Sequence, residues 1–261
     1  MDVRDWPILR RVLEARYRRR FFSASGMGSW YGDFDSFDAA LASAPSDAPT
    51  GYDTQGTETL YDNFFRVDSK DFPVLFWLEK ILQRGDRIFD FGGNVGHTCL
   101  AYRALLSQGA SLTWEVYDVP TTVNEGNRRV REQGIERLSF TTDFTRASGA
   151  AVLLAAGALQ YERRPLWEMI GELGEKPRYV VVNMTPTLVE RSTITLQNIG
   201  PAYCAYRIDA RADLPHGLRT LGYEQLATWV NPDPRTRVPF SNRARRITWV
   251  GHCFRLAANP A

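Results

Sequence analysis

One stretch decides the fold of this chain: Asp86-Arg87-Ile88-Phe89-Asp90-Phe91-Gly92-Gly93-Asn94-Val95-Gly96-His97. Its apolar first half predicts a buried strand, and the small residues that follow predict a tight turn into a helix. Glycine suits such a turn because it adopts backbone angles that are closed to residues with a Cβ, and because it lets the chain come close to a ligand. The N–H groups at the start of the helix would face that ligand. The stretch therefore predicts a cradle for a nucleotide-type molecule.

The composition is that of an ordinary globular protein, since 44% of the 261 residues are hydrophobic and 24% are charged. The formal net charge of +2 is too small to make nucleic acid the main partner, so none is expected. Cys99, Cys204 and Cys253 are widely spaced, which indicates buried thiols and neither disulfides nor zinc ligands. No leader pattern and no apolar run of about 18 residues is visible. We therefore expect a cytoplasmic protein without a membrane span or a metal site.

Beyond the cradle, predicted strands and helices alternate along the chain. The strands are expected over residues 111–117, 138–142, 150–155 and 179–182, and the helices over 123–133 and 165–173. This succession predicts a parallel sheet with helices on both faces. The pattern changes after Thr185, where three segments alternate apolar and polar residues: 203–208, 223–230 and 247–256. They predict an antiparallel hairpin at the edge of the sheet.

The residues before the cradle have a different character. Residues 3–22 predict an arginine-rich amphipathic helix that packs on the domain, although a membrane surface or nucleic acid could also use such a helix. Residues 23–57 predict a loop-rich cover with a short helix near residues 37–42, and residues 64–82 predict a helix that leads into the cradle. The chain is accordingly divided into a cover, residues 1–70, and a ligand-binding domain, residues 71–261.

With these elements in place, the sequence resembles the class I S-adenosylmethionine (SAM)-dependent methyltransferases. Their first motif is an acidic residue, one spacer and a Gly-x-Gly-x-Gly turn, which is similar to Asp90, Gly92, Gly93 and Gly96 here. Asn94 occupies the place of the middle glycine, and asparagine is one of the few residues that accept left-handed backbone angles. The resemblance implies SAM as cofactor and an α/β, Rossmann-like fold. That fold has a mostly parallel seven-stranded sheet, an antiparallel C-terminal hairpin and a helical and loop-rich N-terminal cover.

Further cofactor contacts follow from the same resemblance. Asp118 matches the acidic residue that binds the ribose hydroxyls, and a carboxylate suits a diol because it accepts both hydrogen bonds. Asp143 and Phe144 match the place where the family meets the adenine. The segment that contains Gly157 and Gln160 matches the part beside the methionine half and the reacting methyl group. A dinucleotide site is an alternative interpretation of the glycine turn, although Gly-x-Gly-x-x-Gly fits it poorly.

The resemblance narrows to a poorly characterised bacterial subfamily that is often associated with surface-polysaccharide genes. Its patterns are similar to residues 29–34 with 51–53, and to residues 159–161 with 193–197. In class I enzymes the region before the cradle folds over cofactor and acceptor, and ring faces there could stabilise a sulfonium. Residues expected at the acceptor or in the cover are Trp30, Tyr31, Tyr52, Tyr61, Arg191, Gln197 and Tyr203.

The predicted reaction is methyl transfer to a hydroxyl or carboxyl group of a small-molecule or sugar-type acceptor, that is, O-methylation. Transfer from a sulfonium needs an in-line nucleophile and exclusion of water, whereas a general base is optional. Of the three histidines, His216 is expected in a loop beside Pro215, where it is the freest to act. The candidate catalytic residues are Tyr161, Asn183, Tyr206 and His216.

Two other functions remain open at this point. The chain is also similar in type to SAM-cyclising azetidine-2-carboxylate synthases, in which the α-amine of SAM attacks its own γ-carbon and releases methylthioadenosine. A binding module for SAM or RNA without catalysis, which uses the arginine-rich first helix, is a third possibility. The sequence does not determine the identity of the acceptor or the oligomeric state.

Overall fold

The computed structural model describes residues 7–60, 66–231, 236–244 and 246–257. Five parallel strands form its centre, in the order β4 (Leu138–Thr141), β3 (Thr113–Tyr117), β2 (Arg87–Phe91), β5 (Val152–Ala156) and β6 (Tyr179–Leu188). Beyond β6 lie two antiparallel strands, β10 (Thr248–Leu256) and β9 (Tyr223–Asn231). This arrangement confirms the predicted seven-stranded, mostly parallel sheet with a C-terminal hairpin.

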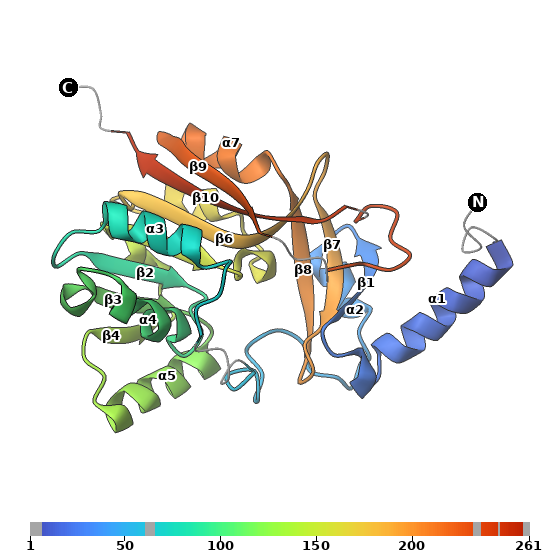
Figure 1. Cartoon of the computed structure of the whole chain (residues 1–261). Helices are drawn as coiled ribbons and strands as arrows, with labels where there is room; N and C mark the ends of the chain where they lie inside the picture. Colours follow the sequence, from blue (N-terminus) through green and yellow to red (C-terminus); the bar gives the residue numbers. More distant parts are fainter. Residues whose placement is uncertain (1–6, 61–65, 232–235, 245, 258–261) are drawn as a thin grey trace.

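Helices cover both faces of this central sheet (Figure 1). One face packs against α3 (Phe72–Ile81), α4 (His97–Tyr102) and α5 (Pro120–Gln133), and the other against α6 (Leu166–Gly171) and α7 (Asp213–Thr220). Successive strand residues point to opposite faces, so Ile88 packs in the first of these cores and Phe89 in the second. The short 3-10 helices of the chain are η2 (Ala24–Gly26), η3 (Arg103–Leu105), η4 (Gly109–Ser111), η5 (Phe144–Ala147) and η6 (Leu159–Tyr161).

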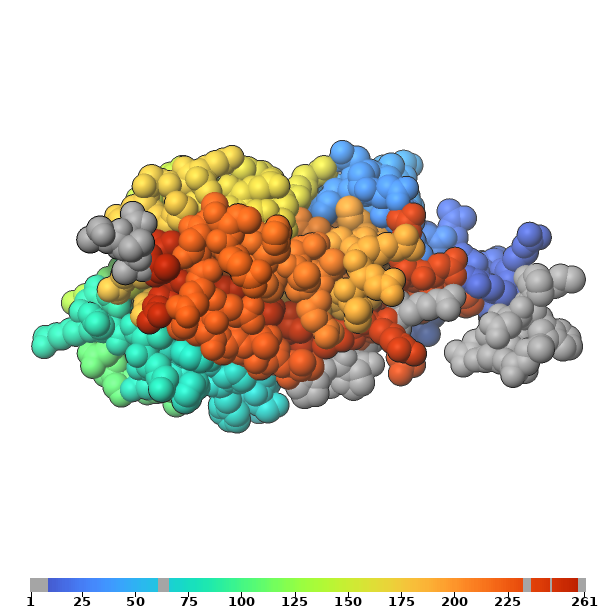
Figure 2. All heavy atoms as spheres, turned by 90° about the horizontal axis from the view of Figure 1, so that it is seen from above, coloured from blue at the N-terminus to red at the C-terminus, as the bar shows by residue number. Residues whose placement is uncertain are grey.

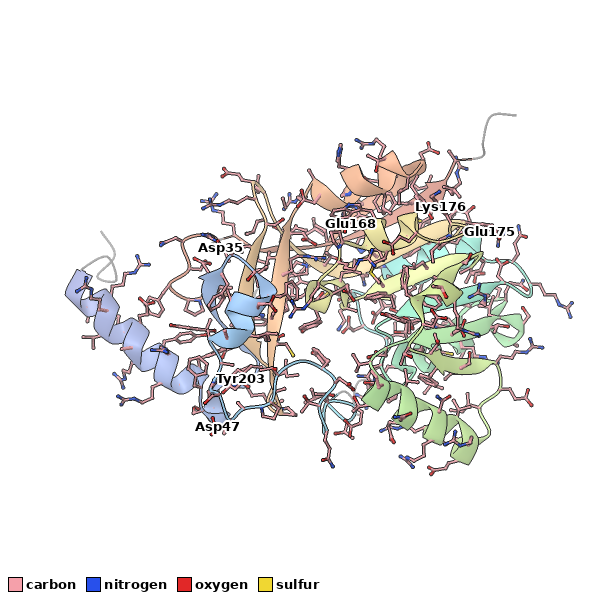
Figure 3. The ribbon with its side chains drawn as sticks, turned by 180° about the vertical axis from the view of Figure 1, so that it is seen from behind. Asp35, Asp47, Glu168, Glu175, Lys176 and Tyr203 are labelled. Carbon is pink, nitrogen blue, oxygen red and sulfur yellow. The ribbon has the colours of Figure 1, made fainter. Side chains whose placement is uncertain are left out.

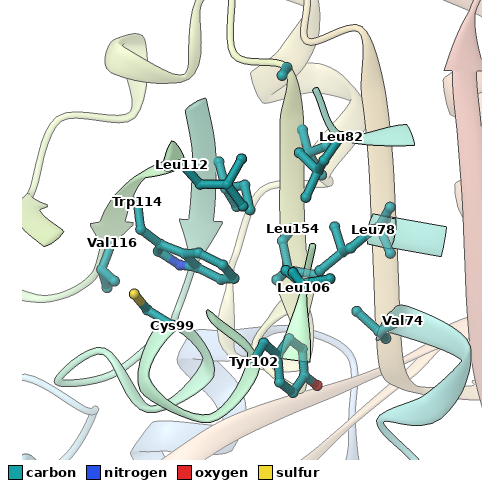
Figure 4. Close-up of a cluster of buried hydrophobic side chains, with 14 of the residues drawn as sticks. Val74, Leu78, Leu82, Cys99, Tyr102, Leu106, Leu112, Trp114, Val116 and Leu154 are labelled. Carbon is teal, nitrogen blue, oxygen red and sulfur yellow. The ribbon is translucent and has the colours of Figure 1, made fainter. Parts of the chain in front are cut away.

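The core on the α3 face is closely packed around Trp114, which is fully buried between the sheet and α4 (Figure 4). Cys99 lies in the same cluster, and Cys204 and Cys253 are also buried and free, which confirms the prediction of buried thiols. Helix α3 begins at Phe72 and is shorter than the predicted helix of residues 64–82. Among the described residues, no helix is both long enough and apolar enough to cross a membrane.

A second, smaller sheet stands beside the first and was not predicted. It consists of β1 (Ser29–Phe34), β7 (Thr193–Asn198) and β8 (Tyr203–Ala210), all antiparallel. The C-terminal end of β6 joins it, because Thr187 and Leu188 pair with Asp209 and Ala210 of β8. Residues 203–208 therefore form a strand as expected, but in this second sheet rather than in the edge hairpin. The cover contains a strand where only loops and a short helix were expected.

Two helices pack on the outer face of the second sheet. They are α1 (Pro7–Phe21) and α2 (Phe37–Ala42), whose apolar side chains meet Leu196, Tyr203 and Ala205. Seen from above, the molecule is elongated, with α1 at the end opposite to α3 (Figure 2). The other face of the second sheet is covered by the connection from β9 to β10, in which Val238 and Ala244 pack beside Tyr206 and Trp249.

Strand β6 changes direction in its middle at a β-bulge. Val250 of β10 pairs with Thr185 and His252 pairs with Val182, so Asn183 and Met184 together face one residue of β10. Met184 has a φ of +51°, in the left-handed region that non-glycine residues rarely adopt. Beyond the bulge β6 no longer pairs with β5, but it still pairs with β10 and then reaches β8 of the second sheet.

Candidate active site

The glycine turn lies at the carboxyl end of β2, where an open α/β sheet binds its ligands. Gly92 has a φ of +68°, and a Cβ on it would lie 2.3 Å from the Cβ of Ala158. A Cβ on Gly93 would lie 2.5 Å from Oδ2 of Asp90. Asn94 has a φ of +53°, which confirms that asparagine takes the left-handed conformation in place of a glycine. Gly96 follows as the N-cap of α4. The turn therefore sits tightly on the strand ends.

Asp118 follows the end of β3 and reaches the same turn. Its Oδ2 accepts a hydrogen bond of 2.9 Å from the backbone N–H of Asn94, and its Oδ1 accepts one of 2.8 Å from the N–H of Val119. Burial raises the pKa of this carboxyl to about 6, and these two hydrogen bonds oppose the rise. A side-chain hydrogen bond with Thr122 also opposes the rise. Asp118 is thus held at the turn by two backbone N–H groups and one side chain.

Asp90 lies beneath the turn and is almost fully buried, at 1% exposure. The indole Nε1 of Trp114 donates a hydrogen bond of 2.9 Å to its Oδ2. Its Oδ1 has no hydrogen-bond partner among the described residues. Burial raises the pKa of Asp90 to about 7, and the charge of Asp118 contributes to the rise. Asp90 supports the turn from the protein side.

Asp143 and Phe144 stand at the end of β4. Asp143 is exposed and caps η5, because its Oδ1 accepts hydrogen bonds from the N–H (2.9 Å) and the hydroxyl (2.6 Å) of Thr145. These hydrogen bonds lower the pKa of Asp143. The ring of Phe144 packs edge-on against Phe91 and Tyr117. The two residues therefore lie at the same sheet edge as the glycine turn.

Gly157 and Gln160 follow β5 at this edge. The amide Nε2 of Gln160 donates a hydrogen bond of 2.6 Å to the carbonyl of Gly157. Gln160 is buried, at 4% exposure, and its Oε1 has no hydrogen-bond partner among the described residues. A buried acceptor without a donor is costly, so this oxygen is suited to a donor group of a ligand.

Four aromatic side chains meet where the two sheets adjoin, and we call them the aromatic cluster: Trp30, Tyr52, Tyr161 and Tyr206. The ring of Tyr161 lies 4.6 Å from that of Tyr52 and 5.3 Å from that of Tyr206, and Trp30 lies 5.7 Å from Tyr206, all edge to face. The hydroxyl of Tyr161 donates a hydrogen bond of 2.7 Å to Oε1 of Gln197. The structure thus brings together five residues that the sequence assigned to the catalytic or acceptor groups.

Other candidates lie away from this cluster. Tyr31 and Tyr203 are on the opposite face of the second sheet, where they pack against Phe21 and Phe22 of the α1 region (Figure 3). Arg191 is exposed in the turn between β6 and β7. Tyr61 lies outside the described residues.

The sequence predicted a loop at His216, but this residue lies within helix α7. Its backbone N–H donates a hydrogen bond of 2.9 Å to the carbonyl of Ala212, so the helix passes through it in spite of the neighbouring Pro215. Proline is tolerated there because it stands in the first turn of the helix, where its missing N–H has no partner to lose. The side chain of His216 is exposed, and its catalytic role stays a prediction.

Asn183 is buried at the bulge of β6 and holds three segments together. Its Oδ1 accepts hydrogen bonds from Nε1 of Trp229 (3.0 Å) and Nδ2 of Asn231 (2.7 Å), and its Nδ2 donates to the carbonyl of Lys70 (3.0 Å). Both lone pairs of the amide oxygen are therefore used within the protein. Asn183 fixes the position of its neighbour Met184, and a direct part in the reaction stays a prediction.

Two residues at this site were not among the sequence-based candidates. Met184 packs against the buried cluster that contains Tyr206, and its Cβ lies 3.7 Å from the place that a Cβ on Gly157 would take. Asp53 accepts a hydrogen bond of 3.0 Å from the backbone N–H of Thr121 at the start of α5. The left-handed angle of Met184 leaves no trace in the sequence, whereas Asp53 stands in the pattern of residues 51–53 and could have been considered.

Comparisons with known proteins bear on the fold. No protein-family model matches the chain, and no curated protein matches it. A geranyl diphosphate methyltransferase solved in complex with SAM has a TM-score of 0.53 and 13% identity over 88% of this chain and 99% of that one. The N-terminal domain of EvdMO1, solved with S-adenosylhomocysteine (SAH) bound, has a TM-score of 0.50 and 13% identity over 95% and 97% of the two chains.

A third solved structure with a similar fold is also described as a methyltransferase. A protein from Galdieria sulphuraria, assigned as a sarcosine dimethylglycine methyltransferase, has a TM-score of 0.50 and 13% identity over 71% of this chain and 86% of that one. At such identities the likeness concerns the fold alone. The chain has the fold of the class I SAM-dependent methyltransferases, with a glycine turn, a strand-end acid and an aromatic cluster gathered at the carboxyl edge of its sheet.

Proposed function

We propose that the chain is a SAM-dependent methyltransferase that transfers a methyl group to a hydroxyl of a small-molecule or sugar-type acceptor. The observation that carries the proposal is the hydrogen bond of 2.9 Å from the N–H of Asn94 to Oδ2 of Asp118. It joins the glycine turn of one strand to an acid at the end of the next strand. A ligand that spans both would present a diol to the carboxylate and its remaining length to the turn.

Several described residues fit SAM. The Asp118 carboxylate is suited to accept hydrogen bonds from the ribose hydroxyls. The ring of Phe144 packs on Tyr117, the residue before that acid, and offers an apolar surface for a base. The unpartnered Oε1 of buried Gln160 suits the ammonium group of the methionine half. The residues therefore form a row of contacts that runs from the end of β4 to the end of β5.

The aromatic cluster begins where this row ends, and it is suited to hold the acceptor. Ring faces of Tyr161 and Tyr206 would line a water-poor space and attract a sulfonium by about 0.5–2 kcal/mol per contact. The Tyr161 hydroxyl donates a hydrogen bond to Gln197. This bond orients the phenolic oxygen, which can accept a hydrogen bond from the hydroxyl group that is to be methylated. When bound, SAM supplies an electrophilic methyl group. The chain's own residues orient the acceptor and exclude water.

The aromatic cluster combines aromatic rings with polar N–H and amide groups, which suits a sugar-type acceptor. Trp30 carries an indole N–H without a partner among the described residues, and Gln197 presents an amide to the same space. The EvdMO1 domain, which is similar over 95% of this chain, was also solved in the presence of SAH and D-fucose. Polyhydroxylated acceptors are therefore the first compounds to test.

The reaction is tested by incubating the purified protein with SAM, alone and with a panel of monosaccharides, nucleotide sugars and phenols. We expect SAH to form only when an acceptor is present, together with a product that is about 14 Da heavier by mass spectrometry, the mass of an added CH2. Methylthioadenosine and a cyclic amino acid formed from SAM alone would contradict methyl transfer and indicate cyclisation.

Cofactor binding is tested with Asp118→Ala. We expect the dissociation constant for SAM, measured by isothermal titration calorimetry, to rise by about tenfold or more, because a charged acceptor of two hydrogen bonds is lost. Glu132→Ala removes an exposed carboxylate of α5 and is the matched control, with unchanged affinity expected. Equal affinities for the wild type and Asp118→Ala would mean that the ribose does not bind at Asp118.

A further inference from the structure

Residues 50–60, which we call the 50–60 segment, connect the two sheets. At one end, Thr50 pairs with Tyr203 of β8, and the N–H of Gly51 donates a hydrogen bond of 2.9 Å to the carbonyl of Tyr203. Further along the segment, Asp53 reaches Thr121 of α5 at 3.0 Å. Figure 1 shows the segment in light blue, running from the lower ends of β7 and β8 toward α5. It therefore bridges the second sheet and the helix that follows Asp118.

The segment is held as a compact unit by Thr57, which is fully buried although it lies in a loop. The Thr57 hydroxyl lies 2.5 Å from the carbonyl oxygen of Tyr52 and 2.7 Å from that of Thr54, and donates toward both. The N–H of Thr57 also donates to the carbonyl of Thr54, at 3.1 Å. Because these contacts tie residues 52 to 57 together, Tyr52 and Asp53 keep a constant relation to each other.

Tyr52 and Asp53 touch opposite ends of the candidate site. The ring of Tyr52 packs on Tyr161 in the aromatic cluster. Asp53 accepts from an N–H in the first turn of α5, and Asp118 accepts from Val119 at the same helix start. The first N–H groups of a helix lack partners within it, and the helix dipole attracts anions there, so this is a stable position for the Asp53 carboxylate.

We propose that Asp53 is a positioning residue for the reaction: its hydrogen bond to α5 fastens the 50–60 segment across the cofactor site and thereby sets Tyr52 on Tyr161. The inference rests on the proposed function, because the segment spans the distance between the acid assigned to the ribose and the ring assigned to the acceptor. Entry of SAM and release of SAH then require the bond between Asp53 and Thr121 to open.

The test is the rate of SAH release, measured by stopped-flow tryptophan fluorescence when protein loaded with SAH is mixed with excess SAM. We expect Asp53→Ala to release SAH about tenfold faster than the wild type, the size that fits the loss of a helix-capping carboxylate, while the association rate changes little. Asp53→Glu should restore part of the slow release. Asp53→Asn, whose amide oxygen can still accept, should lie between Asp53→Ala and the wild type.

A second readout follows the contact itself. Hydrogen exchange at the Thr121 amide should be faster in Asp53→Ala than in the wild type. The control is Asp47→Asn, an exposed carboxylate that precedes the segment (Figure 3) and should alter neither measurement. Unchanged release in Asp53→Ala, with SAH bound normally by the wild type, overturns this inference and leaves the proposed function intact. A wild type that binds neither SAM nor SAH overturns the proposed function and, with it, this inference.

Discussion

Two carboxyl groups at the glycine turn, Asp90 and Asp118, differ in their surroundings although they are neighbours. Asp118 accepts from two backbone N–H groups, whereas Asp90 is bound by the side chains of Trp114 and Thr98, and its Oδ1 has no partner among the described residues. Burial raises the pKa of both carboxyls, to about 7 for Asp90 and about 6 for Asp118. The cradle therefore carries less negative charge near neutral pH than its sequence indicates.

The raised pKa of Asp90 determines how stability depends on pH. Its pKa lies above the ordinary value of 3.8, so ionisation is easier in the unfolded chain. The stability that the neutral form contributes is complete below about pH 4 and is lost as the pH rises through about 7. We expect Asp90→Asn, which keeps an acceptor for Trp114, to gain stability relative to the wild type over this range, by at most about 1.4 kcal/mol per pH unit.

Urea unfolding of both proteins at about pH 5 and about pH 7.5 measures this difference. His252, whose pKa burial lowers to about 4, gives both proteins the opposite slope below its usual pKa of 6.5, so only the difference between the two proteins is informative. A difference in unfolding free energy that is the same at both pH values would contradict the raised pKa of Asp90.

At the scale of elements, the bulge of β6 decides how the two sheets are joined. Asn183 anchors it through Trp229, Asn231 and Lys70, and Met184 takes the left-handed conformation in the next position. Gly251 stands opposite the bulge, and a Cβ there would lie 2.2 Å from the Trp229 ring. The strain at Met184 is thus maintained by hydrogen bonds and packing on both sides.

Glycine and alanine substitutions distinguish the contribution of the Met184 backbone to stability from that of its side chain. Both remove the thioether, but only glycine adopts a φ of +51° without cost. We expect the free energy of unfolding in urea to be about 1 kcal/mol higher for Met184→Gly than for Met184→Ala. Val182 of the same strand is the control, because there Val182→Gly should be less stable than Val182→Ala. The same order of stability at both positions would contradict a strained Met184.

The sequence was sufficient for the elements with strong local patterns. The apolar run that ends in Asp90 and the glycines, the strand before Asp118 and the hairpin of residues 223–256 all lie where the periodicity indicates. Strand β1 was missed because its six residues are all half-buried, so no alternation is visible, and because its partner β7 is remote in sequence. The continuation of β6 was missed because it passes through a bulge and Pro186, which normally argue against a strand.

The site was predictable to a similar extent. The turn and Asp118 belong to contiguous motifs that the sequence shows, whereas the hydrogen bond from Asn94 that connects them is known only from the structure. The aromatic cluster was only partly predictable, because strand parity separates Trp30 from Tyr31, and Tyr206 from Tyr203, onto different faces. Which residues of a strand face the site can be predicted only where the strand itself is predicted, and β1 was not. Roles in catalysis and the division of the chain at residue 70 stay predictions.

At the scale of the whole molecule, the N-terminal and C-terminal parts are fastened to each other through Asp33 of β1. Its carboxylate accepts hydrogen bonds from the Ser241 hydroxyl (2.5 Å) and the N–H groups of Asn242 (2.9 Å) and Arg243 (3.4 Å). These residues belong to the connection from β9 to β10, which covers Tyr206 of the aromatic cluster. The acceptor side of the site is therefore built from both ends of the chain.

Asp33→Ala should loosen this connection. The loss of these hydrogen bonds should favour local opening by about 1–3 kcal/mol, and cleavage by trypsin after Arg243 should become about tenfold faster or more. Asp35→Ala is the matched control, because Asp35 is 87% exposed and pairs only at the surface with Arg243. Equal cleavage rates for Asp33→Ala and Asp35→Ala, measured by mass spectrometry of timed digests, would show that Asp33 does not hold the connection.

The pairing of β1 with β7 has a consequence for synthesis. Ser29 pairs with Asn198, so the second sheet cannot form on the ribosome until about 170 further residues have been added, which takes about 8–35 s at ordinary elongation rates. During that time the rings of Phe21, Tyr31 and Phe37 have no sheet to cover them. These rings are thus made long before the strands that cover them, and they stay exposed to aggregation during that part of translation.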